Sequence, residues 1–250
     1  MACHVAILRP PYPGLILDGV KTIESRLSKQ PVEPFGKVRA GDRLFLKESG
    51  GAFFATALAG RVWTEGDAPP SRIDELARTF DDRVCGGADY WRAKREARFV
   101  TLIAMRNVEP WSHGPDFARR YLKAWYVLDD SACPFVDVPV TCAGIRNGYA
   151  HWPDSWPKPA GVIELDLPGG ETVTTDLASG RRLRERGWGR RYAAANLGPG
   201  DALRWVRTQD PARYRVLYRQ APPCPAPPNN PSRPLRPRLR PASAPTSAMR

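Results

Sequence analysis

Prolines and glycines interrupt the apolar segments of this 250-residue chain, which contains 27 prolines and 21 glycines. The longest nearly apolar runs, 52–59 and 99–105, are short as a result. Runs of this length suit strands or short buried helices, whereas a membrane-spanning helix needs about 20 apolar residues. No basic segment followed by a long apolar one precedes the first predicted strand. We therefore expect a cytoplasmic protein with no membrane partner.

The first part of the chain predicts strands with helices inserted between them. Apolar and alternating patterns indicate strands at 4–8, 21–27, 42–48, 53–63, 99–105 and 135–145. A short helix is expected over 13–18, because proline stands at its start and Gly19 at its end. Amphipathic spacing predicts a further helix from Ser71, and another over 89–97. Strands dominate, so the predicted fold class is mainly β with inserted helices (α+β), and a parallel α/β fold is disfavoured.

Two hairpins are predicted in the second part of the chain. Pro168-Gly169-Gly170 separates two strand-like segments, and a turn at 209–212 separates another two. Leu197-Gly198-Pro199-Gly200-Asp201 resembles the turn of AbrB-like DNA-binding pseudo-barrels. These signals predict a small all-β pseudo-barrel module over 161–220.

Composition suggests where one part of the chain ends and the next begins. The predicted divisions are a first domain at 1–150, a Pro/Trp linker at 151–160, the β module at 161–220 and a tail at 221–250. The tail holds ten prolines, five arginines and no acidic residue. Such a segment cannot bury enough apolar surface to offset its ordering entropy, so we expect it to be disordered.

The formal net charge is +12, and 42% of the residues are hydrophobic. The hydrophobic share is sufficient for a folded core. A basic balance favours polyanionic partners, nucleic acid above all, although a GC-rich genome also raises the arginine content without any binding role. The cysteines are odd in number and form no metal-binding spacing with the three histidines, so we expect no metal site, no cofactor and no disulfide framework.

The segment Gly19-Val20-Lys21-Thr22-Ile23-Glu24-Ser25-Arg26 gathers three charges just after the first predicted helix. On a strand, Glu24 and Arg26 project to the same face, and Lys21 lies at the turn before them. Arginine offers a fixed fork for phosphate or carboxylate, and glutamate accepts hydrogen bonds from an exocyclic amine. The same pattern also fits an ordinary surface ion-pair patch.

The spacing Gly19-x-Lys21-x-x-Glu24-x-Arg26 resembles the signature of the ASCH domain, a branch of the PUA-like superfamily. The flanking segments HVAILRPPY, LILDG, PFGKVRAGD and LFLKESGG resemble that family in the same order, over about residues 3–110. The resemblance implies a small β-barrel with helices covering a cleft. It also implies RNA or a nucleotide-like ligand as the partner, in a cleft lined by Lys21, Glu24 and Arg26. We expect Lys47 and Glu48 to be ligand-binding residues beside them.

Some ASCH proteins are hydrolases, and one branch is an amidohydrolase of N4-acetylcytidine. That branch has a lysine at the position of Lys21 and a threonine nucleophile where this chain has Glu24. Hydrolysis of a modified nucleoside or of RNA, with Lys21 and Glu24 as the acid and base, is therefore an alternative to binding alone. A non-catalytic protein-interaction adaptor is a further alternative. The sequence does not indicate the oligomeric state.

An arginine-rich stretch lies between the two hairpins of the second part. Arginines supply phosphate contacts and aromatic rings supply stacking, so this stretch is a candidate nucleic-acid face. Its predicted members are Arg181, Arg182, Arg184, Arg186, Trp188, Arg190 and Arg191. The alternative is a solvated connection in which Trp188 fills the interior of the module.

Overall fold

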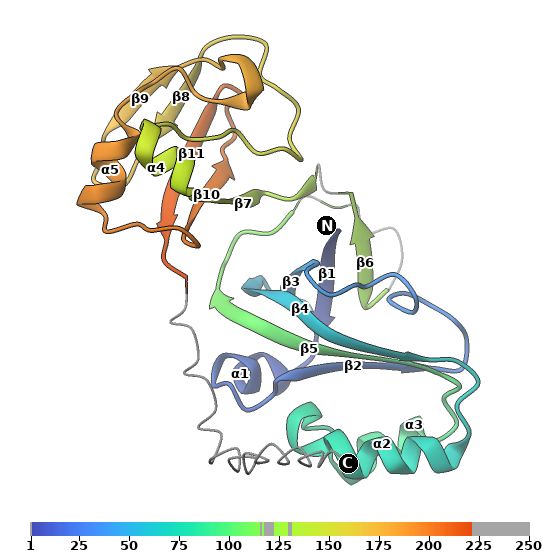
Figure 1. Cartoon of the computed structure of the whole chain (residues 1–250). Helices are drawn as coiled ribbons and strands as arrows, with labels where there is room; N and C mark the ends of the chain where they lie inside the picture. Colours follow the sequence, from blue (N-terminus) through green and yellow to red (C-terminus); the bar gives the residue numbers. More distant parts are fainter. Residues whose placement is uncertain (1, 116, 118–122, 130–131, 222–250) are drawn as a thin grey trace, which may run out of the picture. The chain divides into compact units, whose positions relative to one another are not determined.

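The structure is a computed structural model that describes residues 2–115, 117, 123–129 and 132–221. The tail predicted at 221–250 lies outside these residues except for Ala221. Residues 1–220 form one compact unit. In the described ranges, no helix is long and apolar enough to cross a membrane. Figure 1 shows the elements along the chain.

The first sheet has six strands in the order β2-β5-β4-β3-β1-β6. Its strands are β1 (Cys3–Leu8), β2 (Ile23–Ser28), β3 (Arg43–Glu48), β4 (Phe53–Glu65), β5 (Phe99–Pro110) and β6 (Trp125–Leu128). The pairs are antiparallel except β1 with β3. Register irregularities in the β3–β4 and β4–β5 pairs curl this sheet, because a bulge bends the strand that carries it.

Three helices accompany the first sheet: α1 (Tyr12–Leu17), α2 (Pro70–Val84) and α3 (Gly87–Lys94). The apolar residues of α2 and α3 form one core cluster with Ile23 and Leu27 of β2 and Val100 and Leu102 of β5. Figure 1 shows α2 and α3 next to each other beside these strands. A second cluster, around Leu44, fills the other side of the sheet. The edge strand β2 is therefore held by the apolar cluster that it shares with α2, α3 and β5.

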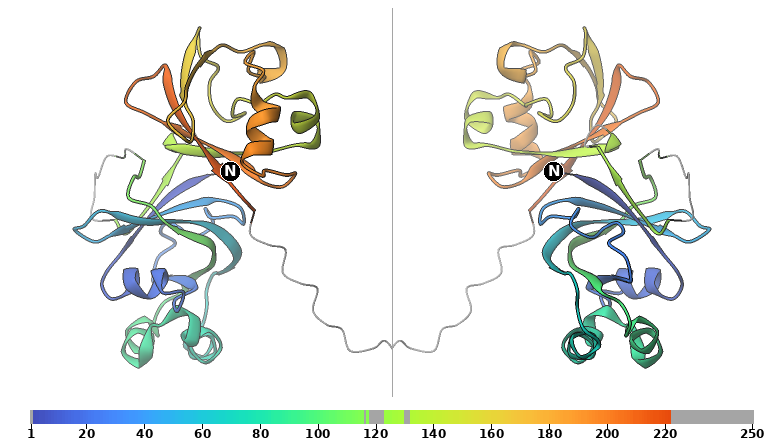
Figure 2. Two further views of the ribbon diagram at one scale, coloured as in Figure 1. Left: turned by 90° about the vertical axis from the view of Figure 1, so that its left-hand side faces the viewer. Right: turned by 90° about the vertical axis from the view of Figure 1, so that its right-hand side faces the viewer.

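The second sheet has five strands in the order β7-β10-β11-β8-β9. Its elements, in chain order, are β7 (Phe135–Pro139), α4 (Cys142–Asn147), β8 (Ile163–Asp166), β9 (Thr172–Thr175), the 3-10 turn η2 (Ser179–Arg181), α5 (Trp188–Ala194), β10 (Ala202–Arg207) and β11 (Arg213–Arg219). Both predicted hairpins are present, as the antiparallel pairs β8–β9 and β10–β11. Figure 2 shows α4 and α5 side by side against this sheet.

The fold class, mainly β with inserted helices, is confirmed by these two sheets. Some local predictions are corrected. The strand predicted over 135–145 ends at Pro139, and α4 begins after Thr141, whose side chain caps the helix by accepting from the Gly144 amide. The module predicted as all-β at 161–220 also contains α5.

The predicted domain division stays a prediction, although β7, from the predicted first domain, pairs with β10 in the second sheet. The segment predicted as a linker holds Trp152 and Trp156, which are buried in the second core.

Candidate functional site

The turn between α1 and β2 places the three charged residues of the 19–26 segment. Gly19 adopts a φ of +72°, a left-handed conformation that glycine takes without strain. The Lys21 amide then donates to the Leu15 carbonyl at 2.9 Å and fixes the start of the strand. Glu24 ends up between two cations, with Oε2 3.4 Å from Lys21 Nζ and Oε1 2.8 Å from Arg26 Nε.

Lys21 is buried, with 2% of its surface exposed. Its Nζ donates to the Ile23 and Val84 carbonyls, at 2.8 Å each, and it lies 4.8 Å from the centre of the Tyr12 ring. An ammonium group has three donors, and two of them are used by these carbonyls while Glu24 lies near the third. Lys21 therefore holds Glu24 and the end of α2 in place.

Arg26 keeps 19% of its side chain exposed. Its Nη2 donates to the Ile7 carbonyl at 3.0 Å, and its guanidinium lies 5.2 Å from the centre of the Trp125 ring. Nε approaches Glu24 as an ion pair but without the angle of a hydrogen bond. In the part of the chain that the structure describes, this buried Nε–H has no hydrogen-bond partner. Nε is itself shielded from solvent and faces the Glu24 carboxylate, so a ligand meets another part of the Arg26 side chain, 19% of which is exposed.

Glu24 and Arg26 lie in the wall of a cavity of about 930 Å³, called here the β2 cavity. Aromatic rings and charged groups surround it together. The aromatic residues are Tyr12, Phe35, Tyr90, Phe99 and Trp125, and the charged residues are Arg9, Glu24, Arg26, Glu33, Lys94 and Lys123. Lys21 is not in this wall, since its side chain lies beneath it.

Ser25 and Tyr90 close one side of the β2 cavity. The Ser25 hydroxyl and the Tyr90 hydroxyl are 2.7 Å apart. Burial raises the pKa of Tyr90, so its hydroxyl stays protonated at neutral pH. Tyr90 and Phe35 were not predicted as site residues, because they come from a helix and a loop whose approach to β2 has no local sequence signal.

Lys47 and Glu48, which were predicted as ligand-binding residues, are not in the wall of the β2 cavity. They lie at the end of β3, and the Lys47 amine donates to the Gly51 carbonyl of the following turn. It also lies 5.8 Å from the centre of the Phe53 ring. The structure thus brings Glu24 and Arg26 to the cavity, while Lys47 is held within its own turn.

The predicted nucleic-acid face needs one correction. Trp188 is completely buried in the second core, and its ring cannot stack on an exposed base. The predicted alternative, that Trp188 fills the interior of the module, describes its position. Arg191 is also held internally, by Glu171 at 2.6 Å and Glu185 at 2.8 Å.

The other arginines of this stretch differ in their exposure. Arg181 is partly buried, donates to the Pro153 and Trp156 carbonyls and lies 3.4 Å from Asp154. Arg182, Arg184, Arg186 and Arg190 are exposed. Exposed arginines are the members of the predicted face that can meet a phosphate group.

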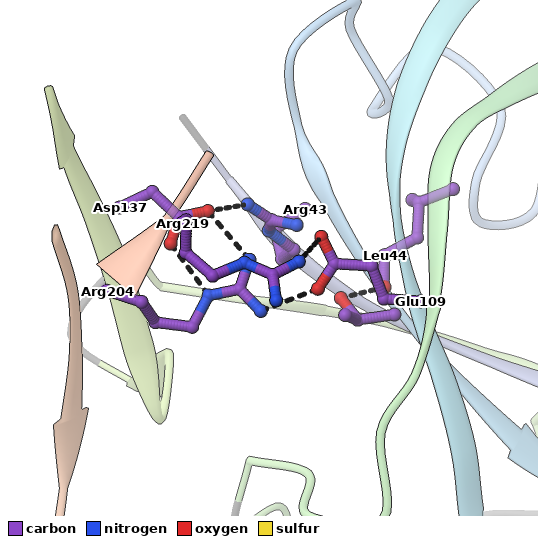
Figure 3. A network of polar contacts seen from close by, with 7 residues as sticks. Arg43, Leu44, Glu109, Asp137, Arg204 and Arg219 are labelled. Carbon is purple, nitrogen blue, oxygen red and sulfur yellow. Dashed lines mark hydrogen bonds and ion pairs between the residues drawn. The ribbon is translucent and has the colours of Figure 1, made fainter. Parts of the chain in front are cut away.

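A second buried ionic cluster was not predicted from the sequence (Figure 3). Arg204 has 2% of its side chain exposed and donates to both oxygens of Asp137, at 2.7 and 2.9 Å, and to Glu109 at 2.7 Å. Arg43 donates to Asp137 at 2.9 Å, and Arg219 pairs with Glu109. Burial raises the pKa of Asp137, but the hydrogen bonds and charge of Arg204 outweigh it and hold this pKa below its usual range.

Comparison with known proteins gives a likeness of fold. No family model matches the chain, and no curated protein matches it. The solved ASCH protein of Zymomonas mobilis is 14% identical over 43% of this chain and 69% of that chain, with a TM-score of 0.35. A mutant structure of that protein gives 17% identity over 43% of this chain and 71% of that one, also with a TM-score of 0.35.

A hypothetical protein of Arabidopsis thaliana is 16% identical over 34% of this chain and 87% of that chain, with a TM-score of 0.26. ASCH domains are thus among the solved structures to which this chain is similar, as the sequence resemblance predicted. The likeness concerns the fold alone, and no ligand or activity follows from it.

Proposed function

We propose that this chain binds RNA or a nucleotide-like ligand in the β2 cavity, with Glu24 and Arg26 as recognition residues. The observation that carries the proposal is the Arg26 guanidinium group, which belongs to the wall of a large cavity and to a side chain that stays 19% exposed. A volume of about 930 Å³ is within the range of small-molecule sites, and a mononucleotide fits such a site.

The charge of the cavity wall favours an anionic ligand. Four cationic side chains line it against two carboxylates, Glu24 and Glu33. Glu24 is already paired with two cations, and Glu33 lies 3.5 Å from Lys123. Arg9 lines the cavity with its side chain exposed. The guanidinium of Arg26 offers directed hydrogen bonds to phosphate.

The aromatic walls favour a ligand that also carries a flat ring. Tyr12, Phe35, Tyr90 and Phe99 are partly exposed at the cavity, and stacking on such rings contributes about 1–3 kcal/mol per base. Each Glu24 oxygen can accept a further hydrogen bond from an exocyclic amine. The sequence resemblance to ASCH domains points to the same ligand class.

Binding without chemistry is favoured over the hydrolase alternative by the state of Lys21. Its amine is buried, donates to two backbone carbonyls and does not line the cavity. An acid or base must come within hydrogen-bond reach of the group it serves. Lys21 would have to give up both carbonyls to do so.

Calorimetric titration with the four nucleoside monophosphates, their nucleosides and a short single-stranded RNA tests the proposal. At least one monophosphate is expected to bind more tightly than its nucleoside. Arg26→Ala should weaken that binding about tenfold or more, since a hydrogen bond to a charged group contributes about 1.5–3 kcal/mol. Arg26→Lys keeps the charge but not the planar fork, and should bind with intermediate affinity.

Arg95→Ala is the matched control, because Arg95 is exposed, pairs with Asp74 and does not line the cavity. It should bind like the unmodified chain. Equal binding by Arg26→Ala and by Arg95→Ala would contradict the proposal, as would the absence of binding to every probe. Release of base or phosphate, or cleavage of the RNA, during the titration would favour the hydrolase alternative.

A further inference from the structure

A second, smaller pocket lies at the arginine-rich stretch of the second sheet. Its volume is about 460 Å³, and it is called here the arginine pocket. Its walls are polar and dominated by one charge sign. The pocket is lined by Asn147, Gly148, Tyr149, Ala178, Arg182, Leu183, Arg184, Glu185 and Arg186.

The backbone presents these arginines along a short irregular segment. Leu183 is buried in the second core, while Arg182, Arg184 and Arg186 are exposed. The chain is extended at Arg182 and bends at Arg184, and all three arginines line the pocket. Alternate residues of an extended chain lie about 6.6 Å apart, which is the spacing expected from Arg182 to Arg184.

Backbone hydrogen bonds on both sides hold this segment in place. The Leu183 amide donates to the Ala150 carbonyl at 3.0 Å. On the other side, the Ala178 amide donates to the Arg182 carbonyl at 2.7 Å, and the Arg184 amide donates to the Asp176 carbonyl at 3.0 Å. The backbone at Arg182 and Arg184 is thus held by the fold, which limits how far these two residues move when a ligand binds.

The charges of the arginine pocket are largely uncompensated. Its lining has three arginines and one carboxylate, Glu185. Glu185 Oε1 is occupied by Arg191 and by the Gly187 amide, at 2.8 and 2.9 Å. Arg184 pairs with the exposed Asp176 at 2.9 Å. Arg182 and Arg186 form no ion pair with any residue that the structure describes, so their charge is available to an anion.

An aromatic ring completes the pocket. Tyr149 is partly exposed, and the Arg182 guanidinium lies 5.5 Å from the centre of its ring. Sites for single-stranded nucleic acid combine a row of cations along the backbone with an aromatic ring on which a base stacks. Repeated phosphates at similar spacing are a property of an extended nucleic-acid strand.

We propose that the arginine pocket binds successive backbone phosphates of a single-stranded nucleic acid, with Arg182, Arg184 and Arg186 as the phosphate contacts and Tyr149 as the stacking ring. This site is separate from the β2 cavity, and the two proposals can fail independently. It replaces the broader face predicted from the sequence, from which Trp188 and Arg191 are removed by burial and internal pairing.

Fluorescence anisotropy with a labelled uridine dodecanucleotide, at about 50 and about 200 mM salt, tests this site. The triple variant Arg182→Ala/Arg184→Ala/Arg186→Ala should bind about tenfold or more weakly at the lower salt concentration. Because each phosphate contact on a single strand contributes about 0.7 to the slope of log K against log salt, the slope should fall by about 2. Tyr149→Leu should weaken binding without changing the slope.

Three arginines in and just after α3 provide a charge-matched control. Arg92, Arg95 and Arg98 are exposed and line neither cavity. Their triple alanine variant changes the net charge by the same amount and should bind the oligonucleotide with nearly the unmodified affinity and slope. If the pocket variant fails to fold, Arg182→Ala and Arg186→Ala are measured singly, and each should lower the slope by about 0.7.

Three outcomes would overturn the proposal. The first is an equal loss of affinity in the control and the pocket variants, which would indicate net charge alone. The second is an unchanged salt slope in the pocket variants. The third is binding of tripolyphosphate that depends on the three arginines while oligonucleotide binding does not, which would assign the pocket to a free phosphorylated molecule. Loss of mononucleotide binding in Arg26→Ala bears only on the β2 cavity.

Discussion

Two buried ionic clusters of the same chemistry differ in how completely their arginines are paired. In the network of Figure 3, Nε, Nη1 and Nη2 of Arg204 all donate to carboxylate oxygens. At the β2 cavity, Arg26 has one hydrogen bond among the described residues, from Nη2 to a backbone carbonyl, and an ion pair between Nε and Glu24 at 2.8 Å. The first arrangement uses all three guanidinium nitrogens on carboxylates, whereas the second leaves N–H groups of Arg26 for a ligand.

The difference shows that burial of charge is not by itself a sign of function. Arg204 is more deeply buried than Arg26, yet each of its three nitrogens donates to a carboxylate. Buried charges are retained where they are paired, and an arginine in a cavity wall that keeps N–H groups to spare is the informative exception. The residues in and around the two clusters should therefore differ in how much their substitution lowers the free energy of unfolding and in how that free energy depends on pH.

The largest expected effect is on the paired network. Arg204→Ala removes three charge-assisted hydrogen bonds and leaves Asp137 with Arg43 alone, so it should lower the free energy of unfolding by about 3 kcal/mol or more. Arg213→Ala is the control, because Arg213 makes the same bidentate contact with Asp166 but is much more exposed. It should cost less than about 1 kcal/mol. Urea unfolding measures both, and equal losses would remove the distinction between buried and surface pairs.

A smaller loss of stability is expected on removing Lys21, whose amine is fully paired beneath the β2 cavity. Lys21→Met leaves the Ile23 and Val84 carbonyls without their donor and should cost about 2 kcal/mol. Lys47→Met, which removes an amine held by one carbonyl of an adjacent turn, should cost well under half of that. If the two variants unfold at the same urea concentration, Lys21 does not hold β2 and α2 together.

The smallest effect on stability is expected from the imidazole of His4, which contacts Trp125 beside Arg26. His4 Nε2 lies 3.2 Å from Asp42, and its Nδ1 accepts from the Trp125 indole at 3.2 Å. Because indole N–H only donates, Nδ1 must be unprotonated for this bond to form. Burial lowers the pKa of His4. The unfolded chain therefore takes up a proton at about pH 6.5, which the folded chain does not, and stability should fall as the pH drops below that value.

Urea unfolding at several pH values between neutrality and pH 5 measures this loss, which cannot exceed about 1.4 kcal/mol per pH unit. His4→Gln can keep both hydrogen bonds without titrating and should flatten the profile. His113→Gln, at an exposed site, should leave the profile as it is. A profile that His4→Gln does not change would mean that another group titrates.

Local features of the fold were predictable from the sequence, and pairings between distant segments were not. The turn at Gly19, α2 and the hairpin at 168–170 each carry their signal within a few residues. The strand predicted over 135–145 ends at Pro139 because Thr141 caps α4, and its pairing with β10, over sixty residues further along the chain, has no local signal. Helix α5 was missed because Gly187 and Gly189 flank Trp188, and glycine has a low helix propensity.

The candidate site likewise contains residues that are close in sequence, which could be predicted, and residues brought together by tertiary packing, which could not. Glu24 and Arg26 are two residues apart on one strand, and their shared face follows from strand periodicity alone. Tyr90 and Phe35 reach the cavity through tertiary packing, which no local pattern encodes. The network of Arg43, Asp137 and Arg204 likewise joins three strands that are far apart in sequence.

The central claim is that the Arg26 guanidinium contacts a ligand in the β2 cavity, and side-chain ¹H–¹⁵N NMR observes the Nε–H of that guanidinium directly. The Arg26 resonance is assigned by its absence in Arg26→Lys, and the Arg204 resonance by its absence in Arg204→Lys. On addition of the tightest-binding nucleoside monophosphate, the Arg26 Nε–H resonance should shift downfield and saturate, while that of Arg204 stays in place. A saturating titration that leaves the Arg26 resonance unmoved, or moves both equally, would contradict the claim.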